Sequence, residues 1–228
     1  MCVPTSTFRA VIFDSDGTLV DSEAPGLDAL HVFCNGLGLP LTREQAHQQF
    51  HGVGLRVCMA WVAGQLDALV GAGAVTSERV DALTAGARAA MNERFRQGLN
   101  PMPGANTLLA RLTLPFCVGT NGPRQKVELA LSLAGLRHHF AAEHLFCAYE
   151  VGIFKPEPGL FLHAAAALGV PPAHCAVVED SLPGVQAGLA AGMQVFTLHP
   201  REGMPPELAE RVVFIDHLGE LERWLPLA

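Results

Sequence analysis

Beyond Pro103 the sequence alternates short, nearly continuous apolar runs with segments of helical periodicity, and this alternation restricts the possible folds more than any other feature. The apolar runs include "PFCVGT", "LFCA", "CAVVED" and "MQVFTL". Such runs are typical of a parallel sheet with both faces covered by helices. With right-handed crossovers the chain would form a doubly wound α/β domain, with Arg9–Phe13 as its first strand.

The stretch from residue 22 to residue 98 has a different pattern. Its apolar residues recur at three- and four-residue spacing through about four segments, and it contains no strand candidate. It closes at "GLNPMPGA", where two prolines and two glycines mark a linker. We therefore predict a discontinuous core domain, residues 1–21 and 99–228, interrupted by an inserted helical domain, residues 22–98.

The composition favours a folded chain and argues against some partners. Hydrophobic residues make up 50% of the 228 residues, which is enough for a sizeable core, and the net charge is −7. We therefore expect no nucleic-acid partner and no membrane partner. No run approaches the ~18 apolar residues of a membrane span, the first residues lack the apolar region of a signal peptide, and the six cysteines form no CxxC pair. These features favour a reduced, cytoplasmic protein.

Polar residues follow three of the predicted strands at the point where each strand ends. They are Asp14 and Asp16, then Thr120 and Asn121, then Glu179 and Asp180, and Lys155 lies shortly after a further apolar run. The carboxyl ends of parallel strands meet at one edge of a sheet, so we expect these side chains to converge. Taken alone, the aspartates and Gly17 suit an ordinary turn equally well.

Clustered carboxylates repel one another and lose water, so such a site calls for a divalent cation. Mg²⁺ binds through one or two carboxylates, a carbonyl and waters, and it leaves positions for a phosphate. One carboxylate can then attack phosphorus, and an aspartate two residues on can serve as general acid and base. Lys155 and the Thr120 hydroxyl would stabilise charge on the phosphoryl oxygens.

Four segments together resemble the ordered motifs of the haloacid dehalogenase superfamily: "DSDGTLVDSE", "TNG", "KPEPGLF" and "VVEDSLPGVQAGLAAGM". The helical insertion resembles the small helical cap of this superfamily. The match spans nearly the whole chain, and it implies a Rossmann-like core with an inserted cap. A lone DxD is a weak signal, whereas all four motifs in order are a strong one.

The resemblance implies a role for each matching residue. Asp14 would be the nucleophile and a Mg²⁺ ligand, and Asp16 would be the general acid and base, with its main-chain carbonyl on the metal. Lys155 would pair with the nucleophile and the phosphate. An acid at the position of Asp16 argues for phosphoryl transfer, because the dehalogenases of the superfamily lack it.

The same resemblance implies binding roles for the residues after the other strands. Thr120 would bind the phosphoryl group with Asn121 beside it. Asp180 would ligate the metal, and Glu179 would ligate it directly or through water. Hinges are expected near residues 20–25 and 98–104.

Substrate choice is expected to depend on the helical insertion. The loop "FHGVGLR" resembles the specificity loop of the cap, which makes His51 and Arg56 the candidates to bind the substrate. The weaker candidates are Asp21, Glu23 and His31. Arg124 and Lys126 either reach the active site or face water, Met59 and Trp61 are interpreted as helix core, and His138–His139 as a surface turn.

The leading hypothesis is a Mg²⁺-dependent phosphatase acting on a small phosphorylated metabolite, such as the sugar phosphate 6-phosphogluconate, through an aspartyl-phosphate. The sequence most resembles the sugar-phosphate phosphatases, including the 6-phosphogluconate type, of the beta-phosphoglucomutase-like subgroup. A phosphonoacetaldehyde hydrolase would need a lysine in the cap, and residues 22–98 contain none.

Two alternatives stay open. A phosphomutase of the beta-phosphoglucomutase type would need a cation such as Arg56 to hold a second phosphate, and a non-catalytic phospholigand-binding protein could share the fold. The expected assembly is a monomer or a weak homodimer.

Overall fold

The computed structural model describes residues 8–70 and 75–228. This part of the chain divides into two compact units, and each is described by itself. One contains the described residues up to Asp21 together with Asn100–Ala228, and the other is Ser22–Leu99. Residues 1–7 of the predicted core and residues 71–74 of the predicted insertion lie outside the described residues.

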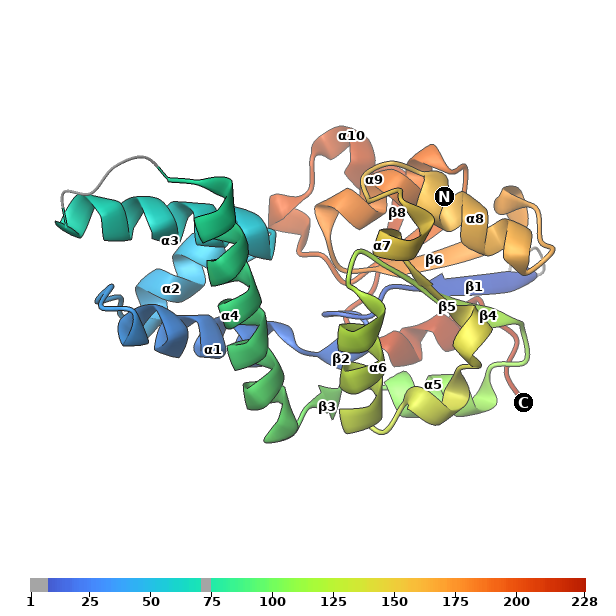
Figure 1. Ribbon diagram of the computed structural model, residues 1–228. Helices are drawn as coiled ribbons and strands as arrows, with labels where there is room; N and C mark the ends of the chain where they lie inside the picture. Colours follow the sequence, from blue (N-terminus) through green and yellow to red (C-terminus); the bar gives the residue numbers. More distant parts are fainter. Residues whose placement is uncertain (1–7, 71–74) are drawn as a thin grey trace. The chain divides into compact units, whose positions relative to one another are not determined.

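The first unit is built on a six-stranded sheet with strand order β5-β4-β1-β6-β7-β8 (Figure 1). Every neighbouring pair is parallel, so the prediction of a doubly wound parallel sheet is confirmed. The strands are β1 Ala10–Phe13, β4 Phe116–Thr120, β5 Leu145–Cys147, β6 Cys175–Glu179, β7 Gln194–Thr197 and β8 Val212–Phe214.

Strand β1 lies in the middle of the sheet, between β4 and β6, and its sequence explains why. Its four residues, Ala-Val-Ile-Phe, are all apolar and all 0% exposed, as is typical of a strand with both faces covered. Phe13 is in register with Val118 on one side and with Val178 on the other. The carboxyl end of β1 is therefore flanked by the ends of β4 and β6.

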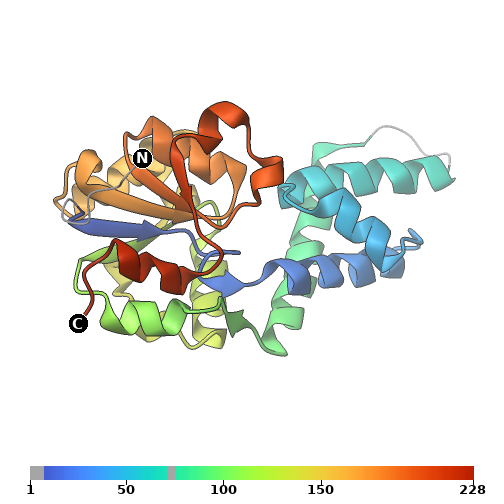
Figure 2. The same cartoon turned by 180° about the vertical axis from the view of Figure 1, so that it is seen from behind.

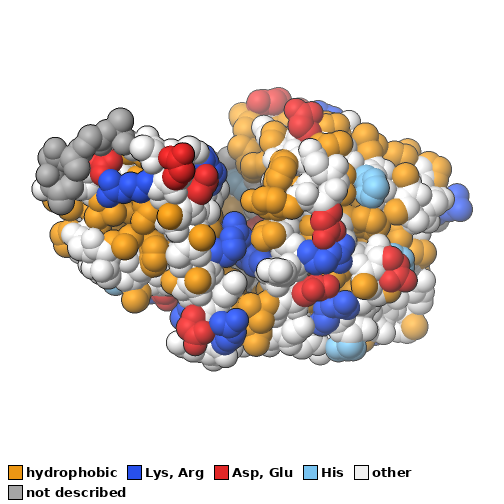
Figure 3. Space-filling view, in the orientation of Figure 1, with side chains coloured by type: hydrophobic (Ala, Val, Ile, Leu, Met, Phe, Trp, Pro, Cys, Tyr) orange, Lys and Arg blue, Asp and Glu red, His pale blue; other side chains and the backbone are white. Residues whose placement is uncertain are grey.

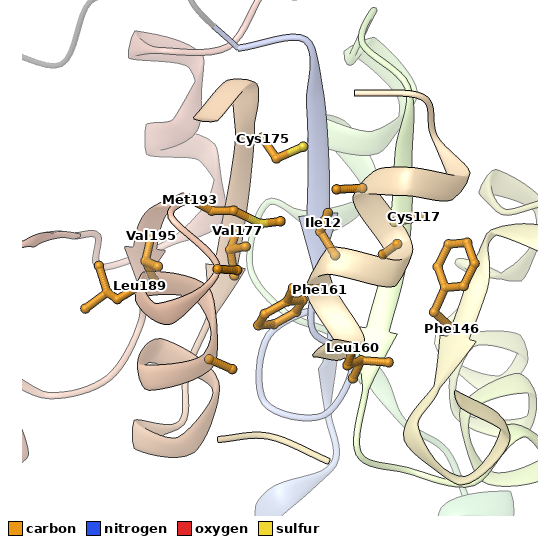
Figure 4. Close-up of a cluster of buried hydrophobic side chains, with 14 of the residues drawn as sticks. Ile12, Cys117, Phe146, Leu160, Phe161, Cys175, Val177, Leu189, Met193 and Val195 are labelled. Atoms are coloured by element: carbon orange, nitrogen blue, oxygen red, sulfur yellow. The ribbon is translucent and has the colours of Figure 1, made fainter. Parts of the chain in front are cut away.

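Helices cover both faces of the sheet, as Figures 1 and 2 show from opposite sides. They are α5 Ala105–Arg111, α6 Arg124–Leu133, α7 Ala148–Val151, α8 Gly159–Ala167, α9 Leu182–Ala190 and α10 Pro206–Ala209. On one face, a buried apolar cluster forms between the sheet and helices α8 and α9. Figure 4 shows Phe161 of this cluster beside Ile12 and Val177.

The second unit consists of helices in its described part, as the periodicity predicted. They are α1 Glu23–Gly36, α2 Arg43–Phe50, α3 Leu55–Val70 and α4 Ser77–Arg96. Met59 is fully buried in their shared core, and Trp61 packs edge-on against Phe50 with ring centroids 5.7 Å apart. Both residues therefore belong to the helix core, as the sequence indicated.

A two-stranded antiparallel ladder joins the chain segments on either side of the second unit. Strand β2, Val20–Asp21, pairs with β3, Asn100–Pro101, so the residues that lead into the helical unit lie beside those that leave it. Asp21 is exposed and pairs through its backbone with Asn100. The predicted hinge segments include this ladder.

The surface and the thiols agree with the composition. On the face seen in Figure 3, the described Lys and Arg side chains lie among Asp and Glu side chains. The five described cysteines are buried free thiols. Within residues 8–70 and 75–228 we find no helix of sufficient length and apolarity to cross a membrane.

The α8–sheet contact yields a stability prediction. Phe161 is 0% exposed, and a Cβ at Gly119 would lie 3.1 Å from its ring. We expect Phe161→Ala to lower the free energy of unfolding by about 3–5 kcal/mol because it leaves a cavity in a packed core. The adjacent Leu162, which is 39% exposed, supplies the control Leu162→Ala, with an expected change of about 1 kcal/mol or less. Urea unfolding measures both, and equal midpoint shifts would contradict this packing.

Candidate active site

The residues predicted to form a site lie at one edge of the sheet. Asp14 directly follows β1, Thr120 ends β4, and Glu179 ends β6. The main-chain N–H of Asp14 donates to the carbonyl of Val178 in β6, and this hydrogen bond fixes Asp14 beside the end of β6. Lys155 lies in the segment between α7 and α8.

Lys155 is the centre of the site. Its Nζ lies 2.6 Å from Asp14 Oδ1 and 2.6 Å from Glu179 Oε1, and all three residues are buried. Burial favours the neutral amine, but the charges of Asp14 and Glu179 outweigh that effect, and the pKa of Lys155 is raised above its ordinary value. The Phe161 ring centroid is 4.8 Å from the ammonium, so the apolar core lies directly against the ion pair.

Glu179 has both carboxylate oxygens engaged. Oε1 accepts from Lys155, and Oε2 accepts from the main-chain N–H of Ser181 at 2.7 Å and from its hydroxyl at 2.8 Å. Ser181 also caps helix α9, since its Oγ accepts from the Gly184 N–H. A Cβ at Gly184 would lie 1.8 Å from Glu179 Oε1, so only glycine fits there. Glu179 therefore orients Lys155, and these contacts favour a metal contact through water over direct ligation.

Asp180 lies beside the turn that follows β1. The Thr18 hydroxyl donates to Asp180 Oδ1 at 3.0 Å. Gly17 has a φ of +78°, and a Cβ at this position would lie 2.0 Å from Asp180 Oδ2. The turn predicted from the sequence is therefore present, and its glycine is needed both for backbone conformation and for space.

Asp14 and Asp180 both hold protons more tightly than isolated aspartates. Burial raises the pKa of Asp14 to about 7, with Lys155 opposing the shift and the charges of Glu179 and Asp16 adding to it. Burial, followed by the charges of Glu179 and Asp14, raises the pKa of Asp180 to about 9. Two neighbouring carboxyls that resist ionisation form a place where a cation would be stabilised.

The oxygen atoms available at this edge, from side chains and from the main chain, suit a hard divalent cation. Among the described residues, no group of three His, Cys, Asp or Glu side chains is arranged as a metal site. Two carboxylates, Asp14 and Asp180, together with a main-chain carbonyl and waters, are what Mg²⁺ accepts. His138 and His139 stack on each other with ring centroids 4.0 Å apart and belong to no such group.

Asp16 and Thr120 meet at a second turn. The Lys126 Nζ lies 2.7 Å from Asp16 Oδ2. A Cβ at Gly122 would lie 3.4 Å from Thr120 Oγ1 and 3.6 Å from Asp16 Oδ2, which brings both side chains to this turn. Thr120 Oγ1 accepts from the Gly122 N–H, which leaves the hydroxyl hydrogen to be donated elsewhere.

Asn121 braces the lysine rather than standing free beside Thr120. Its side-chain oxygen accepts from the Lys155 N–H at 2.9 Å, and its side-chain nitrogen donates to the Lys155 carbonyl at 3.2 Å. The amide thus holds the main chain of Lys155 against the end of β4. A phosphate contact from Asn121 stays a prediction.

The candidates in the helical unit are engaged within that unit. His51 pairs with Glu23 at 3.2 Å, and the His31 ring nitrogen lies 3.1 Å from the Leu41 carbonyl. Arg56 donates to Asp81 at 2.9 Å and to Ser77 Oγ at 2.9 Å. Substrate binding by His51 and Arg56 stays a prediction.

Four residues of this site were missed at the level of sequence: Thr18, Gly122, Ser181 and Gly184. Thr18 lies two residues beyond Asp16, and Ser181 immediately follows Asp180, so their positions in the motifs carried a signal.

The sequence left open whether Arg124 and Lys126 reach the site. Lys126 contacts Asp16, whereas Arg124 pairs with Glu150 at 2.6 Å.

The parallel α/β core and a buried Lys–Asp pair at its carboxyl edge agree with the motifs, and comparison with known proteins gives the family. The model of the haloacid dehalogenase-like hydrolase family matches residues 8–192, and the chain belongs to this family. The predicted resemblance is thereby confirmed.

Individual relatives extend this result. The chain is 34% identical over 220 residues to 6-phosphogluconate phosphatase of Escherichia coli (strain K12), with 96% of each chain covered. It is 30% identical over 201 residues to hexitol phosphatase A of the same organism, with 86% of each covered. A crystal structure of a HAD family hydrolase from Deinococcus radiodurans R1 with bound phosphate and sodium is 32% identical, with a TM-score of 0.68 and with 95% of this chain and 94% of that chain covered.

Removal of the central cation tests the ion-pair geometry. Lys155→Met leaves Asp14 and Glu179 buried without a counter-charge, and we expect a loss of about 3–5 kcal/mol in the free energy of unfolding. The double variant Lys155→Met/Glu179→Gln removes one of the uncompensated charges, so its loss should be smaller than that of the single variant. Chemical denaturation near neutral pH compares the two. A double variant less stable than the single one would show that the charges are not coupled.

Proposed function

We propose that the chain is a Mg²⁺-dependent phosphatase that hydrolyses a small phosphorylated metabolite of the sugar-phosphate class through an aspartyl-phosphate on Asp14. The observation that carries the proposal is the buried Asp14 carboxylate, held by Lys155 at 2.6 Å, with Asp16 two residues on. The names of the two phosphatase relatives and the phosphate bound to the Deinococcus hydrolase support it. Among the sugar phosphates, 6-phosphogluconate is the substrate that we propose.

We propose a separate role for each oxygen of Asp14. Lys155 binds Oδ1, and Oδ2 is the oxygen that attacks phosphorus. As the new P–O bond forms, the bond to the leaving oxygen breaks and its electron pair stays with that oxygen. The leaving oxygen takes a proton from the Asp16 carboxyl. Water then attacks the same phosphorus, gives its proton to Asp16, and releases Asp14 and inorganic phosphate.

Two groups stabilise charge on the transferring phosphoryl oxygens. The Lys155 ammonium is fixed by Asp14 and Glu179, and the Thr120 hydroxyl is oriented by the hydrogen bond that it accepts from the Gly122 N–H. Because both are buried, neither needs to reorganise when the charge develops. Mg²⁺, held by Asp14, Asp180 and the main-chain carbonyl of Asp16 with Glu179 acting through water, would supply neutralising charge when bound.

The helical unit would act as a cap over this edge, with residues 20–25 and 98–104 as its hinges. The second segment contains Gly98 and Gly104, and hinge positions are often small residues. His51 and Arg56 are the residues that we propose to contact the leaving group. We further propose that the protein acts in the cytoplasm as a monomer or a weak homodimer.

The alternatives are less well supported. The two curated relatives named above are phosphatases, whereas a phosphomutase would also need a cation such as Arg56 to hold a second phosphate. A non-catalytic role fits poorly with a site in which the proposed nucleophile, acid and cation all hold chemically competent side chains.

A phosphate-release assay on a panel of phosphorylated metabolites tests the proposed activity. With Mg²⁺ we expect phosphate release from 6-phosphogluconate and other sugar phosphates, and a loss of at least about a thousand-fold in Asp14→Asn because the nucleophile is absent. Asp216→Asn, an exposed substitution outside the site, is the matched control. Equal activity in Asp14→Asn and wild type would overturn the assignment. A requirement for a bisphosphate activator, with little free phosphate released, would favour the mutase.

The raised pKa values of Asp14 and Asp180, about 7 and about 9, predict how pH affects metal binding. An acid whose folded-state pKa is raised favours the folded state at low pH, and that stability is lost as pH rises from about 4 through the raised pKa. A bound cation compensates the charge that appears, and protons compete with it. We therefore expect Mg²⁺ to raise the Tm more at about pH 8.5 than at about pH 6.

Thermal unfolding with and without Mg²⁺ at the two pH values measures this difference. Asp180→Asn should reduce the Mg²⁺-dependent rise in Tm at both. An equal rise at both pH values in wild type would contradict the proposed ligands.

A further inference from the structure

The chain has only two lysines, and each lies against one of the two aspartates of the first motif. Lys155 contacts Asp14, and Lys126 contacts Asp16 with 2.7 Å between Nζ and Oδ2. The Lys126 and Asp16 side chains are 17% and 29% exposed, so this pair lies at the rim of the site and the other pair lies in its floor. The proposed mechanism uses Asp16 but gives Lys126 no task.

The placement of Lys126 is not explained by the helix that carries it. Lys126 is the third residue of α6, and a cation in the first turn of a helix is unfavourable by about 0.3–1 kcal/mol because it faces the positive end of the helix dipole. The first turn of α6 contains no acidic residue to offset this. The compensating carboxylate is Asp16, which is 110 residues earlier in the chain.

The turn before α6 is built to bring the two side chains together. Gly122 has no side chain, and a Cβ there would lie 3.4 Å from Thr120 Oγ1, 3.6 Å from Asp16 Oδ2 and 3.3 Å from Val127 Cγ2. The chain thus passes close to Asp16 before Pro123 starts the helix. Arg124, two residues before Lys126, points elsewhere and donates to Glu150 and to the Leu145 carbonyl. One cation of this turn therefore faces the site and the other does not.

From this geometry, and on the basis of the proposed function, we propose that Lys126 is a positioning residue that holds the Asp16 carboxyl where it can reach the leaving-group oxygen. Asp16 lies in the turn between β1 and β2, and its side chain is partly open to solvent. The Lys126 ammonium donates to Oδ2 at 2.7 Å, so the other oxygen, Oδ1, can carry the proton that the leaving oxygen takes. This contact restricts the rotamers of the Asp16 side chain, and a displacement of about 1 Å can lower a rate by about 100-fold. Lys126 itself transfers no proton.

If Lys126 positions the acid, the effect of removing Lys126 on the rate should depend on the leaving group of the substrate. A sugar alkoxide is a poor leaving group and needs a well-placed acid, whereas p-nitrophenolate leaves without one. kcat/KM covers only the steps up to formation of the aspartyl-phosphate, so it isolates the step in which the acid acts. A lysine that instead contacted the phosphoryl group would affect both kinds of substrate alike.

The experiment compares Lys126→Met with wild type on 6-phosphogluconate, or on the best sugar phosphate of the panel, and on p-nitrophenyl phosphate. We expect kcat/KM for the sugar phosphate to fall by about 10- to 100-fold and kcat/KM for p-nitrophenyl phosphate to stay within about three-fold. Lys126→Arg, which can restore the ion pair, should recover part of the loss. Arg124→Met, on the same turn of α6, should leave both substrates unchanged.

Three results would overturn the proposal: equal losses on both substrates, no loss on either, or a further loss when Lys126→Met is added to Asp16→Asn. In the last case the two residues would act independently, since removal of the acid should abolish the effect of its anchor. Thermal unfolding of each variant excludes misfolding as the cause. If the proposed function itself is wrong, Asp14→Asn retains activity, and that outcome is separate from any result with Lys126.

Discussion

The rest of the core unit is organised around one buried ammonium group, that of Lys155 between Asp14 and Glu179. A charge with so little exposure persists only if both it and its partners are compensated. The compensation extends outward, because Asn121 holds the Lys155 main chain, and Glu179 is held by Ser181 at the start of α9. Strands β1, β4 and β6 thereby become dependent on one another at their carboxyl ends, although their own apolar contacts lie further back in the sheet.

This network also explains why the edge of the sheet is tightly packed with glycines. Gly17 and Gly184 leave room for the carboxylates of Asp180 and Glu179, each of which would collide with a methyl group. By contrast, Gly135 and Gly169 have positive φ, and no atom lies within 4 Å of the position that a Cβ would take there. The first pair is needed for space around charge, and the second pair only for the conformation of a turn.

Much of the fold follows from pattern in the sequence, because a strand buried on both faces can contain almost no polar side chain. The four runs that end at Phe13, Thr120, Glu179 and Thr197 predicted both the sheet and the edge where the polar residues gather. Side-chain direction was less accessible. Arg124 and Lys126 share one turn of α6, and only the three-dimensional turn at Gly122 determines which of them faces Asp16. Likewise, nothing in the sequence distinguishes an Asn121 that binds ligand from one that binds the backbone of Lys155.

The β2–β3 ladder has a consequence for how this architecture can vary. Val20 pairs with Pro101 and Asp21 with Asn100, so the chain leaves and re-enters the core through adjacent positions. To the core, everything between them is a single closed loop, and the entropy of closing a loop grows only slowly with its length. An exchange of the whole insertion for one of another size or shape would therefore leave the sheet and its charged edge intact. The core can keep one chemistry while the inserted segment is replaced as a module.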